Sequence, residues 1–353
     1  MTTYADSGVH LAAARDVTSR LADIVRGART SDVLADVGAF GGMLALDGWG
    51  GVARPVLVAS ADGVGTKVQV AAALGRLDGL GFDIVNHCVN DIAVQGARPL
   101  FFLDYLAMHR AEPTTVAALV EGVAAACRAA AMPLLGGETA EMPDVYAPGD
   151  FDLAGFIVGI ADRDALGRNG APAPGDLLFG LPSSGLHTNG YSLARRALPA
   201  DMWDRFEPEL GTTIGEALLV PHRSYLREIE ALTAAGARAF AHITGGGFPD
   251  NVARMLPESV MAEIDCERWR PPAIFRLIAE AGGVSEDEMY RVFNMGIGLV
   301  AVVPSDRRDA ALAVAPEAIV IGRVQKRKND GEAVELIDWR GWRDLRRSAR
   351  RAG

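Results

Sequence analysis

The sequence predicts an α/β fold of the α+β kind, divided into two domains, on three observations. The chain has 353 residues, more than most single domains contain. Short apolar stretches alternate with amphipathic stretches in both halves, which favours mixed layers over a helix bundle or a β-sandwich. A stretch rich in glycine and proline, GRNGAPAPGD (167–176), interrupts this alternation. We therefore expect an N-terminal domain over residues 1–166, a C-terminal α/β domain over 167–345 and a basic tail over 346–353.

Helical periodicity and short apolar runs define the elements of the N-terminal half. Val85, Cys88, Val89 and Ile92 share one face of a helix, and Thr114 is suited to the N-cap of another. The expected elements are, in chain order, helix 14–29, strand 55–59, helix 81–97, strand 100–108, helix 114–132, a short strand opening into a glycine turn over 133–143, and strand 152–161.

The C-terminal half shows the same alternation of strands and helices. Its expected elements are strand 176–181, helix 189–198, a strand, glycine turn and helix over 241–256, a long strand over 292–304 and strand 318–324. The interleaving of the two element types predicts a layered α/β domain.

Composition limits the function classes and the compartment. Hydrophobic residues make up 49% and charged residues 23%, as in ordinary globular proteins, and the formal net charge is −10. A negative chain argues against general nucleic-acid binding, which depends on many phosphate contacts. The three cysteines are far apart, and neither a signal peptide nor a membrane-spanning apolar run is visible. We expect a cytoplasmic protein that binds neither nucleic acid nor membrane.

Several polar, glycine-rich stretches interrupt the apolar elements. They are DGVGTK (62–67), VND (89–91), GGETAEMP (136–143), SSGLHTNGYS (183–192) and ITGGGFPDN (243–251). Taken singly, each is also explained as a turn, a cap or the solvated face of a helix. Together, three carboxylates beside glycine turns favour a Mg²⁺ site, and a lysine with free backbone amides favours a bound phosphate.

Other familiar signatures are missing. The chain has no GxxxxGK[ST] and therefore no P-loop, and it has no GxSxG, HExxH or zinc-spaced cysteine and histidine cluster. Residues 296–301 match GxGxxA but run into Val-Val-Pro rather than a helix, which argues against a dinucleotide-binding fold.

Nine ordered motifs, from about residue 4 to about residue 324, resemble those of the phosphoribosylformylglycinamidine cyclo-ligases, also called aminoimidazole ribonucleotide synthetases. They are YADSGV (4–9), DGVGTK (62–67), VNDIAVQGARPLFFLDY (89–105), GGETAEMP (136–143), DLAGFIVG (152–159), SSGLHTNGYSL (183–193), ITGGGF (243–248), EMYRVFNMGIG (288–298) and IGRV (321–324).

The resemblance implies a reaction and an assembly. It implies that ATP phosphorylates the formyl amide oxygen of formylglycinamidine ribonucleotide, after which an amidine nitrogen closes an imidazole ring and ADP and phosphate are released. It also implies an ATP and Mg²⁺ site without a P-loop, and a homodimer whose core is the N-terminal mixed sheet with its helices.

The resemblance implies roles for residues in these motifs. The expected metal ligands are Asp62, Asp91 and Glu138. The expected catalytic residues are His187, Lys67 and Asn189. The expected cofactor-binding residues are Asp62, Gly63, Gly65, Thr66, Lys67, Asn90, Asp91, Gly136, Gly137, Glu138 and Thr139. The expected substrate-binding residues are Ser184, Gly185, His187, Thr244, Gly245 and Gly246.

One motif departs from the family pattern, and two alternatives remain open. The N-terminal motif usually reads Tyr-Lys-Asp-Ala-Gly-Val, whereas Ala5 replaces the lysine here and Ser7 the alanine. The alternatives are another ATP-using relative, such as a thiamine-monophosphate kinase, and an inactive paralogue that binds nucleotide. The chain ends in Arg-Ala-Gly and has its first cysteine at Cys88, which argues against the related carbamoyl dehydratases and selenophosphate synthetases.

Overall fold

The computed structural model describes residues 21, 23–34, 42–46, 52–328 and 331–339, and the chain separates into two compact units. Unit 1 contains Met1–Leu166 together with Pro221–Leu226, and unit 2 contains Gly167–Val220 and Arg227–Gly353. The sequence places 221–226 within the C-terminal range, but its contacts lie in unit 1. The motif at 4–9, with Ala5 and Ser7, and the basic tail lie outside the described residues, as does half of the expected helix 14–29, which is helical at 21 and over 23–26.

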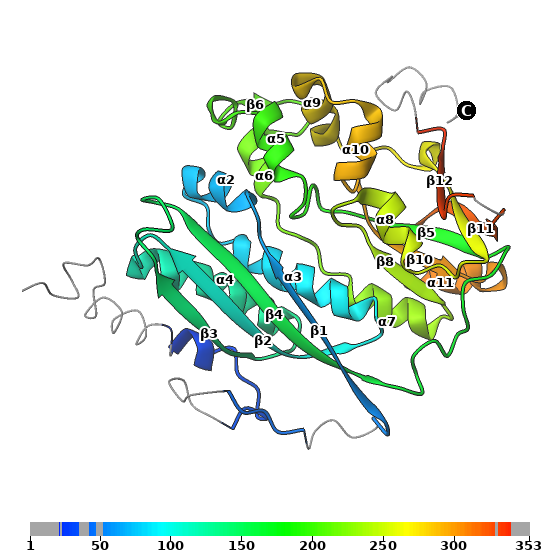
Figure 1. Ribbon diagram of the computed structural model, residues 1–353, viewed down its shortest axis with the longest axis horizontal. Coiled ribbons are helices and arrows are strands. Elements are labelled where there is room, and N and C mark those ends of the chain that lie inside the picture. The colour runs from blue at the N-terminus through cyan, green and yellow to red at the C-terminus, as the bar shows by residue number, and fades with distance from the viewer. Residues whose placement is uncertain (1–20, 22, 35–41, 47–51, 329–330, 340–353) are drawn as a thin grey trace, which may run out of the picture. The chain divides into compact units, whose positions relative to one another are not determined.

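Unit 1 is a mixed four-stranded sheet with helices on one face (Figure 1). Its elements are β1 (Pro55–Gly63), α2 (Lys67–Leu74), α3 (Leu80–Ala93), β2 (Arg98–Met108), α4 (Pro113–Ala129), β3 (Leu134–Glu141) and β4 (Phe151–Asp162). The strand order is β1-β4-β2-β3, in which β2 and β3 are parallel and the other pairs antiparallel. The mixed sheet predicted from the sequence is confirmed.

Helices α3 and α4 pack closely because two glycines face one another. A Cβ atom on Gly81 would lie 2.0 Å from the carbonyl carbon of Gly122, so no larger side chain fits between the helices. Pro113 begins α4 at a position where its missing amide costs nothing. Both helices bury apolar side chains against the sheet.

The register of unit 1 places its motif residues on defined faces of the sheet. Asp62 lies opposite Gly155, which lies opposite Asp104, which lies opposite Gly137, and cross-strand partners share a face. A Cβ on Gly155 would lie 2.8 Å from Ile84 of α3, so this is the face that the helices cover. Glu138 follows Gly137 in the same strand and therefore lies on the opposite face.

Unit 2 is built on a six-stranded sheet. Its helices and strands are β5 (Leu177–Pro182), α5 (Tyr191–Ala197), β6 (Phe206–Glu207), β7 (Thr212–Thr213), α6 (Ile214–Leu219), α7 (Leu226–Ala234), β8 (Ala239–His242), α8 (Gly247–Ala253), β9 (Val260–Asp265), α9 (Ala273–Gly282), α10 (Glu286–Val292), β10 (Ile297–Val303), α11 (Arg308–Val314), β11 (Ile319–Lys326) and β12 (Val334–Ile337). Three 3₁₀ turns, η2 (Ala200–Met202), η3 (Cys266–Arg268) and η4 (Ser305–Arg307), complete it.

The strand order in unit 2 is β12-β9-β11-β5-β10-β8, and all neighbours are antiparallel except β12 and β9. Every residue of β10 is buried, as expected for an apolar strand inside a layered sheet. Helices α5, α6 and α10 each pack against α9, while α8 packs against β8, β9 and β12. Among the described residues, none of the helices has the length and apolarity needed to cross a membrane.

Two motifs take a different local structure from the one the sequence predicts. Strand β1 continues past residue 59 to Gly63, so Asp62 sits in a strand and not in the turn after it. The stretch GGETAE likewise belongs to strand β3 rather than to a glycine turn. In both cases the ladder with neighbouring strands, β4 and β2, overrides the turn propensity of Gly and Asp. Helices α2, α6, α7, α9, α10 and α11 are present although the sequence did not predict them. The expected strand 292–304 starts too early, because α10 ends at Val292 and β10 begins at Ile297.

Candidate active site

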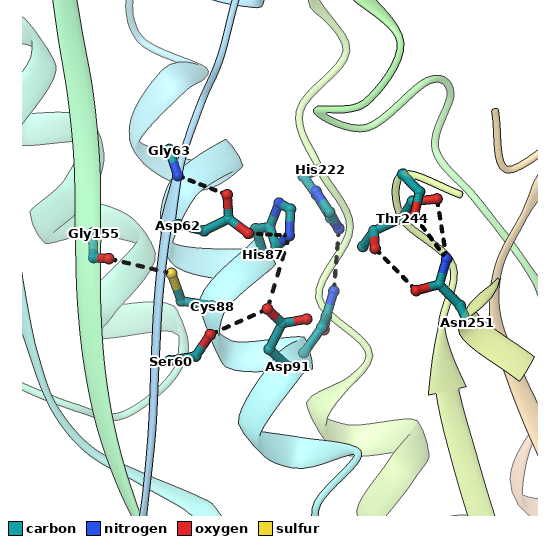
Figure 2. A network of polar contacts seen from close by, with 12 residues as sticks. Ser60, Asp62, Gly63, His87, Cys88, Asp91, Gly155, His222, Thr244 and Asn251 are labelled. Carbon is teal, nitrogen blue, oxygen red and sulfur yellow. Dashed lines mark hydrogen bonds and ion pairs between the residues drawn. The ribbon is translucent and has the colours of Figure 1, made fainter. Parts of the chain in front are cut away.

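Two of the three predicted metal ligands lie together in unit 1, joined by a histidine that the sequence analysis did not select. Nε2 of His87 lies 2.9 Å from Oδ2 of Asp62 and 3.9 Å from Oδ2 of Asp91. Ser60 donates its hydroxyl to the same Asp91 oxygen over 3.2 Å, and the Gly63 amide donates to Oδ1 of Asp62 over 2.7 Å. Figure 2 shows the ring of His87 directed at both carboxylates. Strand β1 supplies Ser60 and Asp62, and α3 supplies His87 and Asp91.

The carboxylates are open to solvent while the histidine is not. The side chains of Asp62 and Asp91 are 38% and 30% exposed, and that of His87 is 5% exposed. Burial disfavours the charged imidazole, but the hydrogen bond with Asp62 and the charges of Asp62, Asp91 and Asp83 outweigh burial and raise the pKa of His87. The arrangement offers hard oxygen donors at the surface, which is the donor set that Mg²⁺ prefers.

Lys67, predicted to contact a phosphate, instead forms a buried ion pair. Its ammonium lies 2.8 Å from Oδ1 of Asp83, and neither side chain is exposed. The amide of His222 donates to the same carboxylate oxygen over 2.7 Å. Burial raises the pKa of Asp83 to about 6, against the opposing effect of Lys67, and burial lowers the pKa of Lys67. In this structure the lysine is therefore internal and does not face a ligand.

Asn90, predicted to bind the cofactor, holds the segment 221–226 onto α3. Its Nδ2 donates to the carbonyl of Arg223 over 2.9 Å, and its Oδ1 accepts from the amide of Tyr225 over 2.8 Å. Asn86, one turn earlier, donates to the carbonyl of His222 over 2.6 Å. These contacts, with that of Asp83, satisfy backbone groups of a segment that has no strand partner of its own. We call residues 221–226 the strap.

The strand residues of GGETAEMP do not join the carboxylate pair. Glu138 is exposed and lies on the face of the sheet opposite Asp62. Gly137 is needed because a Cβ there would lie 2.2 Å from Oδ1 and 2.6 Å from the carbonyl oxygen of Asp104. Gly136 and Thr139 flank these residues in β3, half-buried. Within one chain, the structure brings Asp62 and Asp91 together and leaves Glu138 apart.

Gly65 and Thr66 lie where α2 begins, and both are exposed. Gly65 has a φ of +69°, a conformation that glycine adopts without strain. Thr66 is the N-cap residue of α2, but its side chain makes no capping hydrogen bond. Of the DGVGTK motif, Asp62, Gly65 and Thr66 are therefore accessible to a ligand, whereas Val64 and Lys67 are buried.

In unit 2, His187 lies in a tight loop after β5. Its side chain is fully buried, its φ is +63°, and its Nε2 accepts a hydrogen bond from the amide of Ser184 over 3.2 Å. An imidazole nitrogen that accepts cannot carry the proton, so Nε2 is the unprotonated nitrogen in this arrangement. The positive φ of a non-glycine residue is a strained conformation of the kind that gathers at functional sites.

Asn294, which lies just before β10, holds the start of this loop through its side-chain amide. Its Nδ2 donates to the carbonyl of Gly185 over 2.9 Å, and its Oδ1 accepts from the hydroxyl of Ser183 over 3.0 Å and from the amide of Gly296 over 2.8 Å. Ser184 remains exposed between these anchored residues. Asn294 belongs to the motif EMYRVFNMGIG (288–298), but no local pattern singles out its side-chain amide.

A second amide, that of Asn251, shapes the glycine turn between β8 and α8. Its Nδ2 donates to the carbonyls of Thr244, Gly245 and Gly247 over 3.2, 3.2 and 2.8 Å, and Thr244 donates back over 3.2 Å (Figure 2). A Cβ on Gly245 would lie 3.5 Å from Oδ1 of Asn189. The structure therefore brings together Asn189 and Gly245, two residues that the sequence predicts for catalysis and substrate binding.

The residues that sequence reasoning missed, Asp83, Asn86 and His87, share one pattern on α3 with the selected Asn90 and Asp91. Asp83, Asn86, His87, Asn90 and Asp91 recur at intervals of three and four, so they form a polar stripe on a helix that is otherwise apolar. The interpretation of VND as a solvated helix face is wrong for Asn90, which is fully buried, whereas Asp91 is partly exposed. A polar stripe that contains two asparagines and a histidine beside apolar residues is the signal that could have indicated an internal network.

Solved structures with the same fold carry other activities. The chain resembles the thiamine-monophosphate kinase of Stenotrophomonas maltophilia K279a, with a TM-score of 0.62 and 20% identity over 90% of this chain and 96% of that one. It also resembles the hydrogenase maturation protein HypE of E. coli, with a TM-score of 0.64 and 17% identity over 92% and 93% of the two chains. At these identities the likeness shows the fold alone.

Sequence comparison is more specific. Two family models match the chain: AIR synthase related protein, N-terminal domain, over residues 50–161, and AIR synthase related protein, C-terminal domain, over residues 173–335. A phosphoribosylformylglycinamidine cyclo-ligase of Anaeromyxobacter sp. (strain Fw109-5) is 48% identical over 336 residues, which cover 92% of this chain and 96% of that protein. With this identity sustained across both domains, the chain belongs to the phosphoribosylformylglycinamidine cyclo-ligase family.

Proposed function

We propose that this protein catalyses the ATP-dependent ring closure of formylglycinamidine ribonucleotide to aminoimidazole ribonucleotide, with release of ADP and phosphate, in purine biosynthesis. The formyl amide oxygen attacks the γ-phosphoryl group of ATP, ADP leaves, and an iminophosphate forms. The amidine nitrogen of the same substrate then attacks the activated carbon, the C–O bond to phosphate breaks, and the imidazole ring closes. Family membership across the whole of both matched domains supports this proposal.

The observation that carries the proposal is the pair formed by Asp62 and Asp91. Two solvent-accessible carboxylates on neighbouring elements, joined through His87, fit a divalent cation that also binds nucleotide phosphates. Mg²⁺ held there would neutralise charge on the transferring phosphoryl group. Gly65 and Thr66 lie three and four residues beyond Asp62 and present exposed backbone at the start of α2, where we place the ATP phosphates.

We assign the substrate to the loops of unit 2. The amides of Gly245 and Gly246 stand in a turn whose carbonyls are already engaged by Asn251, which directs donors outward to an anion such as the ribose phosphate. His187 is held by Ser184 in one ring orientation, and we propose that it stabilises charge or moves a proton at the formyl group. Asn189 beside Gly245 is suited to orient the same substrate.

We revise two of the roles that the resemblance implies. Lys67 and Asn90 have structural roles and do not bind the cofactor. The side chain of Lys67 pairs with Asp83, and that of Asn90 binds the backbone of the strap. Glu138 is left out of the metal site formed within one chain. The predicted role of residues 1–166 in binding ATP and metal and in dimerisation is kept, and to the predicted C-terminal α/β domain, apart from 221–226, we now add the role of holding the substrate.

We also propose a homodimer located in the cytoplasm. The face of the unit 1 sheet turned away from α3 and α4 exposes large apolar side chains: Phe156 is 45% exposed, and Leu57 on β1 is 64% exposed. Exposed apolar side chains on an uncovered sheet favour burial against a second copy. Sedimentation equilibrium of the wild-type protein and of a Phe156→Glu variant would test this, and a monomeric wild-type protein would contradict it.

The activity is tested by ADP release with ATP and Mg²⁺, with and without formylglycinamidine ribonucleotide, while the aminoimidazole product is measured in parallel. We expect substrate-dependent ADP release with one ring product per ADP. Asp62→Asn should abolish turnover, whereas Asp78→Asn, an exposed aspartate in the same unit, should not. Thiamine monophosphate serves as a second substrate: its phosphorylation would favour the kinase alternative, and nucleotide binding without ADP release would favour an inactive paralogue.

A further inference from the structure

The position of His87 has a consequence for how the two carboxylates are held. The residue lies on α3, where its ring is packed 5.2 Å from the ring of His222, which is itself buried. The Nε2 edge of the imidazole points to Asp62 and Asp91 (Figure 2). The ring therefore spans the gap between strand β1 and helix α3.

The imidazole of His87 restrains both carboxylates, together with neighbouring donors. Asp62 is fixed at both oxygens, at Oδ1 by the Gly63 amide and at Oδ2 by His87. Oδ2 of Asp91 lies near both Ser60 and His87. Two carboxylates that share a site repel one another, and a donor between them offsets this repulsion. Without His87, the side chain of Asp62 would be free to turn toward water.

Exposure places the imidazole behind the carboxylates. A cation that arrives from solvent meets side chains that are 38% and 30% exposed before it reaches one that is 5% exposed. Mg²⁺ also favours oxygen over nitrogen donors. Both arguments separate His87 from the ligands and assign it to the shell that orients them.

We propose that His87 is a positioning residue, which holds Asp62 and Asp91 in the arrangement that receives the divalent cation and does not itself bind the metal. This inference rests on the proposed metal site of the cyclo-ligase function. Residues that orient metal ligands typically contribute about 10- to 100-fold to metal affinity, because the ligands are ordered before the ion binds.

The test compares His87→Gln, which keeps a side-chain N–H donor, with His87→Leu, which has none. His109→Gln is the matched control, because His109 lies in the same unit and its Nδ1 lies 3.2 and 2.8 Å from the carbonyl oxygens of Pro143 and Tyr146 rather than near the two carboxylates. Mn²⁺ affinity is measured by electron paramagnetic resonance, with and without a non-hydrolysable ATP analogue. Thermal unfolding in EDTA checks that each variant is folded.

We expect His87→Leu to weaken Mn²⁺ binding by about 10- to 100-fold, and His87→Gln and His109→Gln to stay within about threefold of the wild type. Pulsed resonance of the wild-type Mn²⁺ complex should show no directly bound imidazole nitrogen. The KM for the metal–ATP complex should rise in His87→Leu more than kcat falls.

Three results would overturn the inference. They are unchanged Mn²⁺ affinity in both His87 variants, a nitrogen coupling that disappears in His87→Gln, and a wild-type protein that binds no Mn²⁺. If His87→Leu fails to fold, affinity and nitrogen coupling in His87→Gln still decide. None of these readouts needs the ribonucleotide substrate, so a protein that binds Mn²⁺ as expected but forms no ring product would contradict the proposed function and leave the role of His87 standing.

Discussion

The ammonium group of Lys67 lies 2.8 Å from Oδ1 of Asp83, and both side chains are fully buried. The same Asp83 oxygen accepts the amide of His222 in the strap. A lysine from the glycine-rich motif at the end of β1 is thereby connected to a segment more than 150 residues later in the chain. The buried pair therefore stabilises the interior of unit 1 and is not part of the surface that would bind a ligand.

Replacing Lys67 by methionine should destabilise the protein strongly. The change keeps the length of the side chain but leaves the buried Asp83 without its cationic partner, and breaking a buried pair on one side costs about 3–5 kcal/mol. Urea unfolding followed by circular dichroism measures the loss. The double variant Lys67→Met with Asp83→Leu should recover a large part of it, because no buried charge remains.

A different result would support the predicted role of Lys67 as a phosphate-binding residue. If Lys67→Met unfolds at the wild-type urea concentration and loses affinity for ATP, the lysine contacts phosphate and the buried pair is not its main role.

Replacing Asn90 by alanine should release the strap. The side chain supplies a donor to Arg223 and an acceptor to Tyr225, so its loss leaves buried backbone groups without these bonds, at about 1–3 kcal/mol for each group. Hydrogen exchange of the Tyr225 amide should accelerate, while amides of the buried strand β10 in unit 2 should exchange as in the wild type. Mass spectrometry of the peptide spanning 221–226 provides the measurement.

Asn169→Ala is the matched control for this experiment. Its Nδ2 donates to the carbonyls of Thr233 and Ala237, so it too makes two side-chain hydrogen bonds with backbone groups, but within unit 2. Exchange at Tyr225 that rises equally in both variants would show a general loss of stability rather than a specific release of the strap.

The architecture was largely predictable because it follows from periodicity. The apolar runs and helical faces of the sequence locate β2, β4, α3 and α4, since burial of one face dictates the spacing of apolar residues. The strand character of Asp62 and of GGETAE was not predictable from local propensity. Glycine and acidic residues favour turns, and only pairing with β4 and β2 keeps them extended.

Two of the three acids predicted for the candidate site, Asp62 and Asp91, lie together, whereas Glu138 and the supporting residues were not predictable. Asp62 and Asp91 stand beside each other as expected, because they end two neighbouring elements. The roles of Lys67, Asn90 and Asp83 depend on the strap, which approaches α3 from more than 120 residues away in sequence. No local sequence pattern predicts a contact between segments so far apart. A lysine beside glycines is therefore equally typical of a residue that binds phosphate and of one in a buried ion pair.

The two adjacent glycines of GGETAEMP should respond differently to alanine. A Cβ on Gly137 would lie 2.2 Å from Oδ1 and 2.6 Å from the carbonyl oxygen of Asp104, and the backbone atom cannot move aside. A Cβ on Gly136 has a methyl group of Leu103 at 3.9 Å as its nearest neighbour. We expect Gly137→Ala to lose about 1–3 kcal/mol of stability through overpacking, and Gly136→Ala to stay within about 0.5 kcal/mol of the wild type.

Equilibrium unfolding of the two variants in the same buffer makes this comparison. Equal losses would show that β3 is sensitive to any side chain at this point, and the close approach to Asp104 would then not be the reason for Gly137.

Asp104 itself should make the stability of the protein fall as the pH rises. The carboxyl is buried on the helix-covered face of the sheet, and burial raises its pKa to about 7, with a smaller opposing effect of a backbone hydrogen bond. In the unfolded chain the pKa is about 3.9. Below pH 4 both states hold the proton. Between these two pKa values only the folded state holds it, so raising the pH through this window costs stability, and above pH 7 the loss is complete.

The variant Asp104→Asn has nearly the same shape and cannot ionise, so it should escape this loss. Relative to the wild type, it should gain about 2–3 kcal/mol between pH 5 and pH 8, measured by urea unfolding at each pH. Other groups that titrate in this range are common to both proteins, and the difference between the two curves isolates Asp104. A difference that is constant across this range would show that the carboxyl is already ionised at pH 5 and is stabilised by groups around β3. In that case the burial of Asp104 would carry no penalty, and the close fit of Gly137 would serve a charged group.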